Sequence, residues 1–229
     1  MVATIKLGTV QEGKLVKRQN RFAAVVELAE ETIKTYVPNP GRMEELLVPG
    51  KQVLVSYVSK PSRKTEYDLL QVRYEGTWVS VDSRLPNKLI AKALENKELA
   101  EINDYSRVRP EYNYGNSRLD FLLTGGERDI LIEVKSVTLV ESGVAKFPDA
   151  PTKRGRRHID ELIKAKQEEY RPVVLFVVQR EDAHYFTPCE RIDLAFGEKL
   201  TDLKAEGGEI YAYDCWVSER EVSLRNRLE

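Results

Sequence analysis

Short apolar segments separated by turn residues fill the first 80 residues of the chain. Val, Leu, Ile and Phe recur in stretches of strand length at residues 4–17, 21–27, 32–37, 52–58 and 67–74. About five strands in so short a segment are typical of a small closed barrel. Residues 43–47 are expected to form one or two turns of helix that end at Pro49 and Gly50. We therefore predict an all-β, OB-like barrel over residues 1–80, with a small β-sandwich as the alternative.

A different pattern begins at residue 81, where helical and strand-like segments alternate. Pro86 suits a helix N-terminus, and Leu89, Ala93 and then Ile102 recur at helical spacing. The segments expected to follow are strands at 107–114, 118–123 and 129–134, a helix at 152–170, a strand from 172, a helix at 192–205 and a strand at 209–217. The uninterrupted apolar run Val173–Gln179 is typical of a strand covered on both faces. Residues 81–229 are therefore predicted to form an α/β domain around a central mixed sheet, which makes the chain a two-domain α+β protein.

Three charged residues interrupt the apolar hairpin predicted between Ser117 and Ser136, namely Asp120, Glu133 and Lys135. Side chains two positions apart on a strand share a face, so Glu133 and Lys135 point the same way. If the strands pair across the turn at residues 124–126, Asp120 lies on that face too. Two carboxylates and an amine at the edge of a sheet are able to hold a divalent cation and a water. This cluster is the candidate site.

The alternative for these residues is an ordinary solvent-facing ion pair on a strand. Against it, the apolar residues 130–132 before Glu133 indicate a covered strand, where an unpaired carboxylate is costly. A hard cation with oxygen ligands offsets that cost, and Mg²⁺ or Mn²⁺ is the expected ion. Asp120 and Glu133 would hold it, with the Val134 carbonyl as a further candidate ligand. Lys135 would orient a bound water or stabilise negative charge on a phosphate.

Basic side chains cluster where the helix at residues 152–170 is expected to begin. Thr152 can cap this helix, and Pro148 and Pro151 stiffen its approach. The cluster comprises Lys153, Arg154, Arg156, Arg157 and the adjacent His158. Backbone N–H groups at a helix N-terminus already favour anions, so a phosphodiester is the expected partner. The alternative is a solvated basic face whose side chains pair with Asp160 and Glu161.

Composition narrows the classes of partner. The 229 residues carry 36 Lys and Arg against 37 Asp and Glu, a formal net charge of −1, so any contact with nucleic acid must use local patches. Two cysteines are too few for a disulfide framework, and no Cys/His spacing indicates zinc. No apolar run has the length of a membrane span and no signal-peptide pattern opens the chain, so we expect a cytoplasmic protein.

Four longer motifs stand out: Pro38–Leu47 (PNPGRMEELL), Ser117–Phe121 (SRLDF), Glu133–Thr138 (EVKSVT) and Phe147–His158 (FPDAPTKRGRRH). Together they resemble the sugar fermentation stimulation protein A (SfsA) family, over essentially the whole chain. Within them, the D…ExK arrangement resembles the PD-(D/E)XK nuclease core. The resemblance implies an OB-like domain followed by a restriction-endonuclease-like domain, DNA binding, and a link to the regulation of sugar, notably maltose, metabolism. One departure is Pro40, where the family usually has Thr, so any ligand contact made by that Thr is lost here.

The resemblance also implies residue roles in the second domain. Asp120, Glu133 and Lys135 take the metal and catalytic positions of the nuclease core. Glu111 matches an acidic position of the family and is a candidate further metal ligand, with a solvated strand-end glutamate as the alternative. Asp149 belongs to the last of the four motifs. A glutamate on the first helix is a further candidate, and those available are Glu95, Glu98 and Glu101.

The first domain offers candidates for binding nucleic acid. Asn39 and Arg42 belong to the NPGR loop, and Lys60, Arg63 and Lys64 form a basic loop. OB-like barrels bind oligonucleotides through loops and one sheet face, with aromatic rings for stacking. The tyrosines available for this are Tyr36, Tyr57, Tyr67 and Tyr74, none of which the sequence singles out.

These observations favour a DNA-binding protein with a divalent-metal-dependent phosphodiesterase (nuclease) site. The alternative is a DNA-binding transcriptional regulator of sugar (maltose) metabolism without nuclease activity. A small-molecule-responsive sensor is a third reading, which rests on the family's link to sugar metabolism and has no sugar-site signature in the residues. DNA is the expected partner, no membrane is expected, and a homodimer stays open because many nucleases of this type act as dimers.

Overall fold

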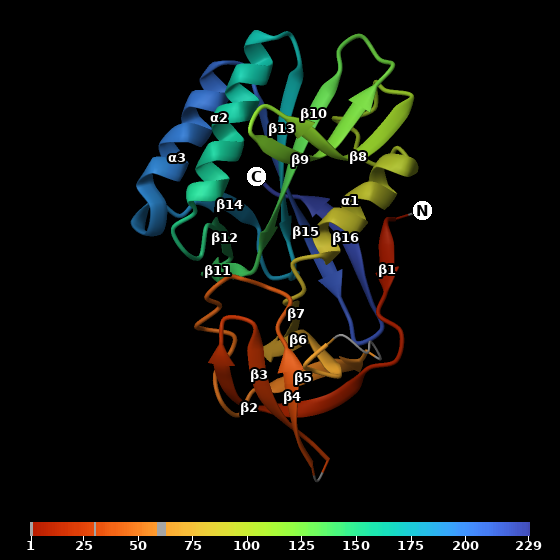
Figure 1. The fold of residues 1–229 in the computed structure, drawn as a ribbon, viewed down its shortest axis with the longest axis vertical. Helices are drawn as coiled ribbons and strands as arrows, with labels where there is room; N and C mark the ends of the chain where they lie inside the picture. Colours follow the sequence, from red (N-terminus) through yellow and green to blue (C-terminus); the bar gives the residue numbers. More distant parts are fainter. Residues whose placement is uncertain (1, 30, 59–62) are drawn as a thin grey trace.

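The computed structural model describes residues 2–29, 31–58 and 63–229, so Lys60 of the expected basic loop lies outside the described residues. Figure 1 shows a β-barrel beside a larger layer of strands flanked by helices. The first elements are β1 (Thr4–Lys6), β2 (Gln11–Asn20), β3 (Ala23–Leu28), β4 (Glu31–Tyr36), β5 (Gln52–Tyr57), β6 (Tyr67–Tyr74) and β7 (Thr77–Ser80). They are followed by α1 (Leu85–Glu95), β8 (Arg107–Tyr114), β9 (Ser117–Thr124), β10 (Ile130–Val137), β11 (Leu139–Glu141), β12 (Val144–Phe147), α2 (Lys153–Gln167), β13 (Arg171–Val178), β14 (Tyr185–Pro188), α3 (Glu190–Ala205), β15 (Glu209–Val217) and β16 (Glu221–Arg227). None of the helices in the described part of the chain is long and apolar enough to cross a bilayer.

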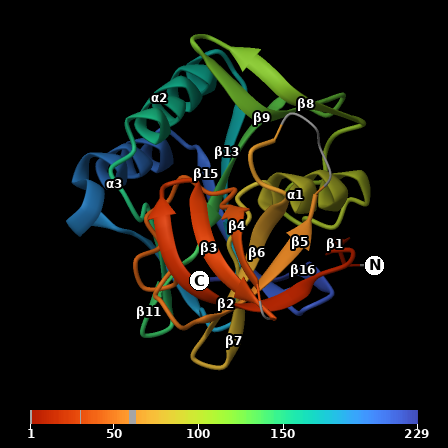
Figure 2. The same cartoon turned by 60° about the horizontal axis from the view of Figure 1, so that its bottom comes forward.

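The barrel closes through five strands in the order β4-β3-β2-β5-β6, because β6 returns to pair with β4. Alternate side chains of these strands point inward, and Leu15, Val26 and Val53 are buried in the interior. Figure 2 brings this barrel forward and shows its curved strands. The expected OB-like barrel is confirmed, since the closing β4–β6 pair is what a two-sheet sandwich lacks.

The first strand lies outside the barrel. Residues 4–17 were expected as one strand, but they contribute to β1 and β2, which Gly8 separates with a φ of 73°. β1 pairs antiparallel with β16, with Thr4 opposite Ser223, at the edge of the large sheet. Residues 4–6 therefore belong to the sheet of the second domain, which corrects the predicted boundary of the barrel domain at residues 1–80.

Residues 43–47 form a turn instead of the expected helix. The Leu47 N–H donates to the Met43 carbonyl at 2.9 Å, but Met43 has a φ of 47°, which a right-handed helix does not accommodate. Met43 and Leu46 are both buried in the barrel core. The turn at residues 43–47 therefore places both Met43 and Leu46 in the barrel core.

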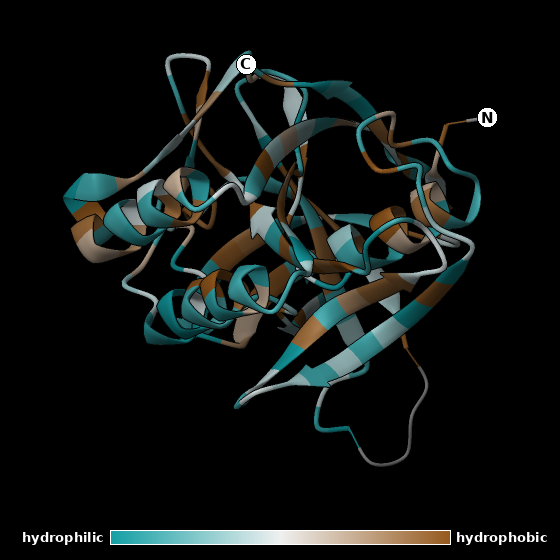
Figure 3. Ribbon diagram, turned by 90° about the horizontal axis from the view of Figure 1, so that it is seen from above, coloured by the Kyte–Doolittle hydropathy of each residue, from teal (hydrophilic) through white to brown (hydrophobic). Residues whose placement is uncertain are grey.

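Seven strands form the large mixed sheet in the order β1-β16-β15-β13-β10-β9-β8. Strands β10, β13 and β15 are parallel neighbours. Along β13, Val173 and Leu175 pack with the side chains of α1, whereas Val174 and Phe176 pack with those of α2 and α3. The strand is therefore covered on both faces, as its apolar sequence predicted. Figure 3 shows the hydrophobic strands between the helices.

The second domain contains elements that the sequence pattern did not indicate. A small sheet pairs β11, β12 and β14, and β16 follows the strand that was expected to be the last. α1 ends at Glu95 rather than continuing to Ile102, because Lys97 turns the backbone to a φ of 55°. Ile102 still packs in the same core as the apolar side chains of α1.

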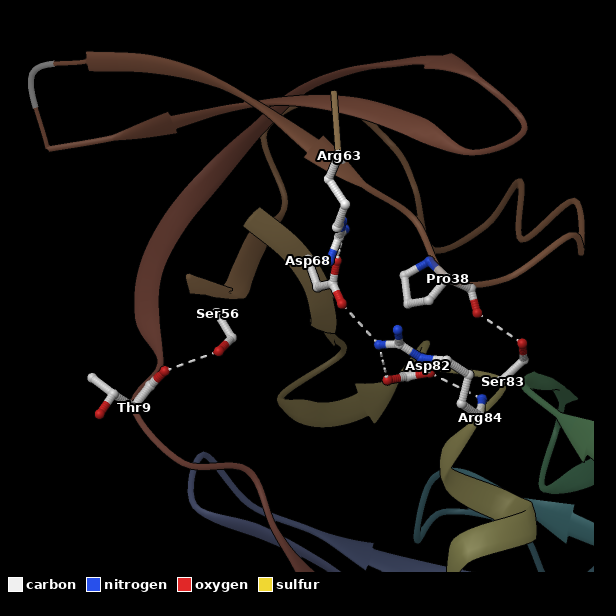
Figure 4. Close-up of polar contacts among 8 residues, drawn as sticks. All are labelled: Thr9, Pro38, Ser56, Arg63, Asp68, Asp82, Ser83 and Arg84. Atoms are coloured by element: carbon white, nitrogen blue, oxygen red, sulfur yellow. Dashed lines mark hydrogen bonds and ion pairs between the residues drawn. The ribbon is translucent and has the colours of Figure 1, made fainter. Parts of the chain in front are cut away.

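Polar contacts join the barrel to the start of α1, as Figure 4 shows. Arg84 donates to Asp82 at 2.6 Å and to Asp68, on β6 of the barrel, at 2.9 Å. The Ser83 hydroxyl donates to the Pro38 carbonyl at 2.7 Å. The NPGR loop, which begins beside Pro38, is thereby held close to the second domain.

Arg180 forms a second connection between the two domains. Its side chain is 1% exposed and lies over the ring of Tyr74 on β6, 5.0 Å from the centroid. Two of its nitrogens donate to Asp182 at 2.6 Å each, which neutralises its buried charge. The neighbouring Gln179 accepts a hydrogen bond from the Ser80 hydroxyl at 2.9 Å. The barrel is therefore fixed against the ends of β10 and β13.

Candidate functional site

Two carboxylates come together where β9 and β10 separate. The strands pair in register as far as Ile132 and Phe121. Continuing this register would place Asp120 opposite Glu133. Instead of a backbone carbonyl, the Asp120 side chain accepts the next hydrogen bond, from the Val134 N–H to Oδ2 at 2.7 Å. The predicted convergence of Asp120 and Glu133 is thus present in the structure.

Asp120 is held by α1 as well as by β10. Its Oδ1 accepts a hydrogen bond from Asn87 Nδ2, in the first turn of α1, at 2.6 Å. Burial and the neighbouring negative charge of Glu133 raise the pKa of Asp120 to about 6. Hydrogen bonds from Val134 and Asn87 oppose this rise only in part. A positive charge placed next to Asp120 would therefore stabilise its ionised carboxylate.

Glu133 is 3% exposed and has one oxygen with partners and one without. Its Oε1 accepts hydrogen bonds from Lys135 Nζ at 2.5 Å and from His158 Nδ1. Its Oε2 is buried and has no hydrogen-bond partner among the described residues. Burial by itself raises the pKa of Glu133, but Lys135 and His158 bring it below the usual value, so the side chain is ionised.

His158 connects this cluster to α2. Its Nε2 accepts a hydrogen bond from Arg154 Nε at 3.3 Å, so Nδ1 is the ring nitrogen that carries a proton. Nδ1 then donates to Glu133. α2 itself begins with an N-cap, in which Thr152 Oγ1 accepts a hydrogen bond from the Gly155 N–H at 3.0 Å. His158 therefore acts through Glu133, as a residue that positions the carboxylate.

The donor set suits a hard divalent cation, which prefers oxygen ligands. Glu133 Oε2 is uncommitted, and each oxygen of Asp120 accepts one recorded hydrogen bond and keeps a further lone pair. Within the described residues, no three His, Cys, Asp or Glu side chains are grouped so that they could hold a metal ion. A cation here would thus have two carboxylate ligands from side chains, and water or backbone oxygens would complete its shell.

Glu111 is not part of this cluster. It is exposed on β8 and forms an ion pair of 3.5 Å with Arg118, which is exposed as well. Its φ of 55° departs from the strand conformation. Glu111 is therefore solvated, as in the alternative that the sequence left open, but it lies within β8 and not at the end of the strand.

α1 contributes an asparagine to the cluster instead of a glutamate. Glu95 is exposed, Glu98 accepts a hydrogen bond from Asn96, and Glu101 accepts one from the Tyr213 hydroxyl at 2.5 Å. Asn87 was missed at the level of sequence. The only signal for it is its place one residue after Pro86, in the first turn of the predicted helix.

The basic cluster at the start of α2 divides into exposed and paired side chains. Lys153, Arg154 and Arg157 are exposed. Arg156 instead donates to the buried carboxylate of Asp193 at 2.6 Å, and this pair joins α2 to α3. The exposed members are available to bind an anion, whereas Arg156 has a structural role in this conformation.

The two acids of α2 have partners other than these arginines. Asp160 pairs with Lys199 of α3, and Glu161 lies 3.6 Å from Lys164 on its own helix. The alternative in which Asp160 and Glu161 neutralise the arginines at the start of α2 does not match these pairs. The positive charge of the exposed arginines therefore faces solvent.

The NPGR loop is held by polar contacts from both domains. Asn39 is buried, and its Oδ1 accepts a hydrogen bond from the Gly41 N–H at 2.8 Å. Asp149 of the second domain accepts a hydrogen bond from the Met43 N–H at 3.2 Å. Arg42, between these two contacts, is exposed. Asn39 and Asp149 thus shape the loop, and Arg42 is the side chain that it presents to solvent.

Comparison with known proteins covers both domains. A family model described as "SfsA N-terminal OB domain" matches residues 16–81, and one described as "Sugar fermentation stimulation protein RE domain" matches residues 84–221. A "Sugar fermentation stimulation protein homolog" from Alkaliphilus metalliredigens is 46% identical over 219 residues, which is 95% of this chain and 94% of that protein. A homolog of the same description from Caldanaerobacter subterraneus subsp. tengcongensis is 43% identical over 218 residues, 95% of each chain.

A solved structure matches the whole fold. It is described as "The structure of Pyrococcus Furiosus SfsA in complex with Ca2+", and it superimposes with a TM-score of 0.91 at 30% sequence identity. The match covers 100% of this chain and 98% of that one. Both the barrel and the α/β domain therefore have counterparts in that protein.

Proposed function

The chain belongs to the sugar fermentation stimulation protein (SfsA) family, and we propose that it is a DNA-binding protein with a divalent-metal-dependent phosphodiesterase site. The observation that carries this proposal is the buried, unpartnered Oε2 of Glu133 beside Asp120. A buried charged oxygen without a partner destabilises a fold, and a coordinated cation removes that penalty. Mg²⁺ or Mn²⁺ is the proposed ion, with Asp120 and Glu133 as its side-chain ligands.

The relative from Pyrococcus furiosus supports a cation in this family, because its structure is described as a complex with Ca²⁺. Ca²⁺, Mg²⁺ and Mn²⁺ all prefer oxygen ligands such as carboxylates and water. The carboxylate pair of this chain has that chemistry. The pKa of Asp120 is raised by burial and by the negative charge of Glu133, and a bound cation would oppose both effects.

When bound, such an ion lowers the pKa of a coordinated water and offsets the charge of a phosphodiester. The chain's own residues prepare the site for this. His158 and Asn87 fix the orientations of Glu133 and Asp120. Lys135, whose side chain is 11% exposed, carries a positive charge beside Glu133, where it would stabilise the charge that develops on the phosphate.

The start of α2 would bind the DNA backbone. Lys153, Arg154 and Arg157 are exposed in its first turns, and the same helix carries His158. Arg154 also donates to His158, so the phosphate-binding segment and the carboxylate cluster lie next to each other. This arrangement would bring a phosphodiester close to Glu133 and Lys135.

The proposal is tested by calorimetry with Mg²⁺ and Mn²⁺, followed by cleavage assays on single-stranded and duplex DNA with the same samples. Wild type is expected to bind the ion and to cut DNA. Asp120→Asn should lose ion binding and cutting but keep DNA binding, and Lys135→Ala should lose cutting. Asp160→Asn is the matched control, because Asp160 pairs with Lys199 on the surface. Absence of ion binding at millimolar concentrations, with and without DNA, would overturn the proposal.

A DNA-binding transcriptional regulator of sugar metabolism without nuclease activity is the second candidate. It is favoured by one observation: within the described residues, no third acidic, His or Cys ligand joins Asp120 and Glu133. The relatives' name, sugar fermentation stimulation protein, also suits this role. For such a regulator, DNA binding would be independent of metal and of Asp120→Asn. It would weaken when Arg154 or Arg157 is neutralised.

A further inference from the structure

The outer surface of the barrel has a hollow of about 490 Å³ that combines aromatic and basic side chains. We call it the aromatic hollow and define it by Asn20, Phe22, Lys34, Tyr36, Arg63 and Lys64. These residues come from the β2–β3 turn region, from β4, and from the segment before β6. No acidic residue of the described chain lines it. The hollow therefore combines two aromatic rings with basic side chains.

The aromatic part is a stacked pair with one uncovered ring. Phe22 and Tyr36 are nearly parallel, with an interplanar angle of 20° and centroids 6.3 Å apart. Phe22 is nevertheless 44% exposed. Its backbone is fixed, because its N–H donates to Asn20 Oδ1 and its carbonyl accepts from the Val37 N–H, both at 2.9 Å. A partly exposed phenyl ring on a backbone held by hydrogen bonds is suited to stacking against another flat ring.

The basic side chains around this pair are also positioned. The Arg63 guanidinium lies over the Tyr36 ring, 5.3 Å from its centroid. Arg63 is held there by its ion pair with Asp68, which Figure 4 shows. Lys34 and Lys64 complete the rim of the hollow. A ligand that stacks on Phe22 therefore meets cations on its rim, which is the environment of a phosphate next to a base.

A second hollow of about 430 Å³ shares Asn20 with the first and continues toward α2. Three arginines line it, Arg18, Arg21 and Arg42, together with Ala150 and Pro151 just before the helix. Among the described residues, its lining is also without an acid. The two adjoining hollows thus form a basic path from Phe22, past the NPGR loop, to the start of α2.

We propose that the aromatic hollow binds an unpaired base of single-stranded nucleic acid, by stacking on Phe22, while the phosphates of the strand follow the arginines toward α2. The destination of this path rests on the proposed function, because it leads to the candidate phosphodiesterase site. A single strand is required, since the faces of the bases in a duplex are already stacked on one another. The barrel is then the part of the protein that selects unpaired strands.

Binding is measured by fluorescence anisotropy with a labelled oligothymidylate of about 12 nucleotides, in the presence of EDTA. Phe22→Ala is expected to weaken this binding about 5- to 100-fold, the range of one lost base–aromatic stack. Phe22→Trp should restore it. Affinity for a duplex of the same length should change by less than about twofold, because duplex binding relies on phosphate contacts. A matched oligouridylate distinguishes RNA from DNA as the source of the strand.

Tyr57→Ala is the matched control. Tyr57 is another exposed ring of the barrel, 54% exposed, that packs edge-on against Tyr67 and does not line the aromatic hollow. Tyr57→Ala should leave the affinity for oligothymidylate unchanged. The thermal midpoint of Phe22→Ala should equal that of wild type, which shows that the fold is intact. Three results would each overturn the inference. They are equal losses of affinity in Phe22→Ala and Tyr57→Ala, equal losses of affinity for the single strand and the duplex in Phe22→Ala, and no binding of either oligonucleotide by wild type.

The two proposals fail in different ways. Loss of single-strand binding in Phe22→Ala, together with no ion binding by the wild type, would support the aromatic hollow and overturn the phosphodiesterase site. If Phe22→Ala binds the ion, cuts DNA and keeps the wild-type affinity for single-stranded oligonucleotide, only the aromatic-hollow proposal is overturned.

Discussion

His158 on α2 donates a hydrogen bond from Nδ1 to Oε1 of Glu133 on β10, and both side chains are buried. This bond joins the helix that presents the exposed arginines to the strand that presents the candidate metal ligands. Hydrogen bonds between buried polar groups are costly to leave unmade, so the two parts keep a fixed relation. The exposed start of α2 and the carboxylate of Glu133 are therefore connected directly by this contact.

Removing that contact should destabilise the protein. In His158→Ala, Glu133 keeps Lys135 but loses a buried donor, and we expect the free energy of unfolding to fall by about 1–3 kcal/mol. Urea denaturation measures this change. His184→Ala is the control, since His184 is exposed and a surface change stays within about 0.5 kcal/mol. Equal stabilities of the two variants would show that the His158 bond contributes nothing.

The metal-free protein should lose stability as the pH rises through the titration of Asp120. Its pKa is raised from 3.8 to about 6 in the fold, so the folded state binds the proton more tightly than the unfolded state. The resulting stabilisation is present below about pH 4 and is lost as the pH rises through about 6. It corresponds to roughly 3 kcal/mol.

Asp120→Asn removes this titrating group. In EDTA, the stability of wild type relative to Asp120→Asn should therefore fall by roughly that amount between about pH 4 and pH 7.5. Asp160→Asn should instead follow the wild-type curve. Stability profiles of wild type and Asp120→Asn that run parallel across this interval would contradict the cause that we assign to the Asp120 pKa.

The two neighbouring arginines of α2 should respond differently to neutralisation. Arg157 is exposed, so Arg157→Gln should weaken DNA binding, lower its salt dependence by about one counterion and leave stability unchanged. Arg156 pairs with the buried Asp193, so Arg156→Gln should lower the free energy of unfolding by about 1–3 kcal/mol. Anisotropy in a salt series and urea denaturation measure the two effects. The same pattern in both variants would rule out this division of roles.

Gly41 should be intolerant of a side chain because of Asp149. A Cβ at Gly41 would lie 2.5 Å from Asp149 Oδ2, closer than non-bonded contact allows. Gly41→Ala is expected to cost about 1–3 kcal/mol and to weaken oligonucleotide binding by displacing Arg42. In the double variant Gly41→Ala/Asp149→Ala, the loss of stability should be smaller than the sum of the two single losses. Additive losses would mean that the clash lies elsewhere.

The hairpin that carries the candidate site was predictable because its information is local. Side chains alternate along a strand, so Glu133 and Lys135 had to share a face, and the glycines at 125 and 126 indicated the turn that brings Asp120 back. The uninterrupted apolar run of β13 likewise predicted a strand buried on both faces. The longer motifs also predicted the family and an OB-like domain followed by the α/β domain, and the comparisons confirm both.

Contacts between segments distant in sequence were decided only by the tertiary structure. Glu111 matched the family by position, yet it pairs with Arg118 at the surface, and Asn87 of α1 holds Asp120. The roles of His158 and of the Phe22–Tyr36 pair likewise depend on which strand or turn packs against which neighbour.

The sequence by itself therefore determined the periodic features of this protein: the main strands of both domains, the shared face of Glu133 and Lys135, the basic start of α2 and the family. The tertiary structure decided which of those charges are paired and which are open, and it placed β1 in the second sheet. The physical reason is that periodicity is set within a few residues. Pairing and burial depend instead on long-range packing, which also excludes water from some side chains and leaves others exposed.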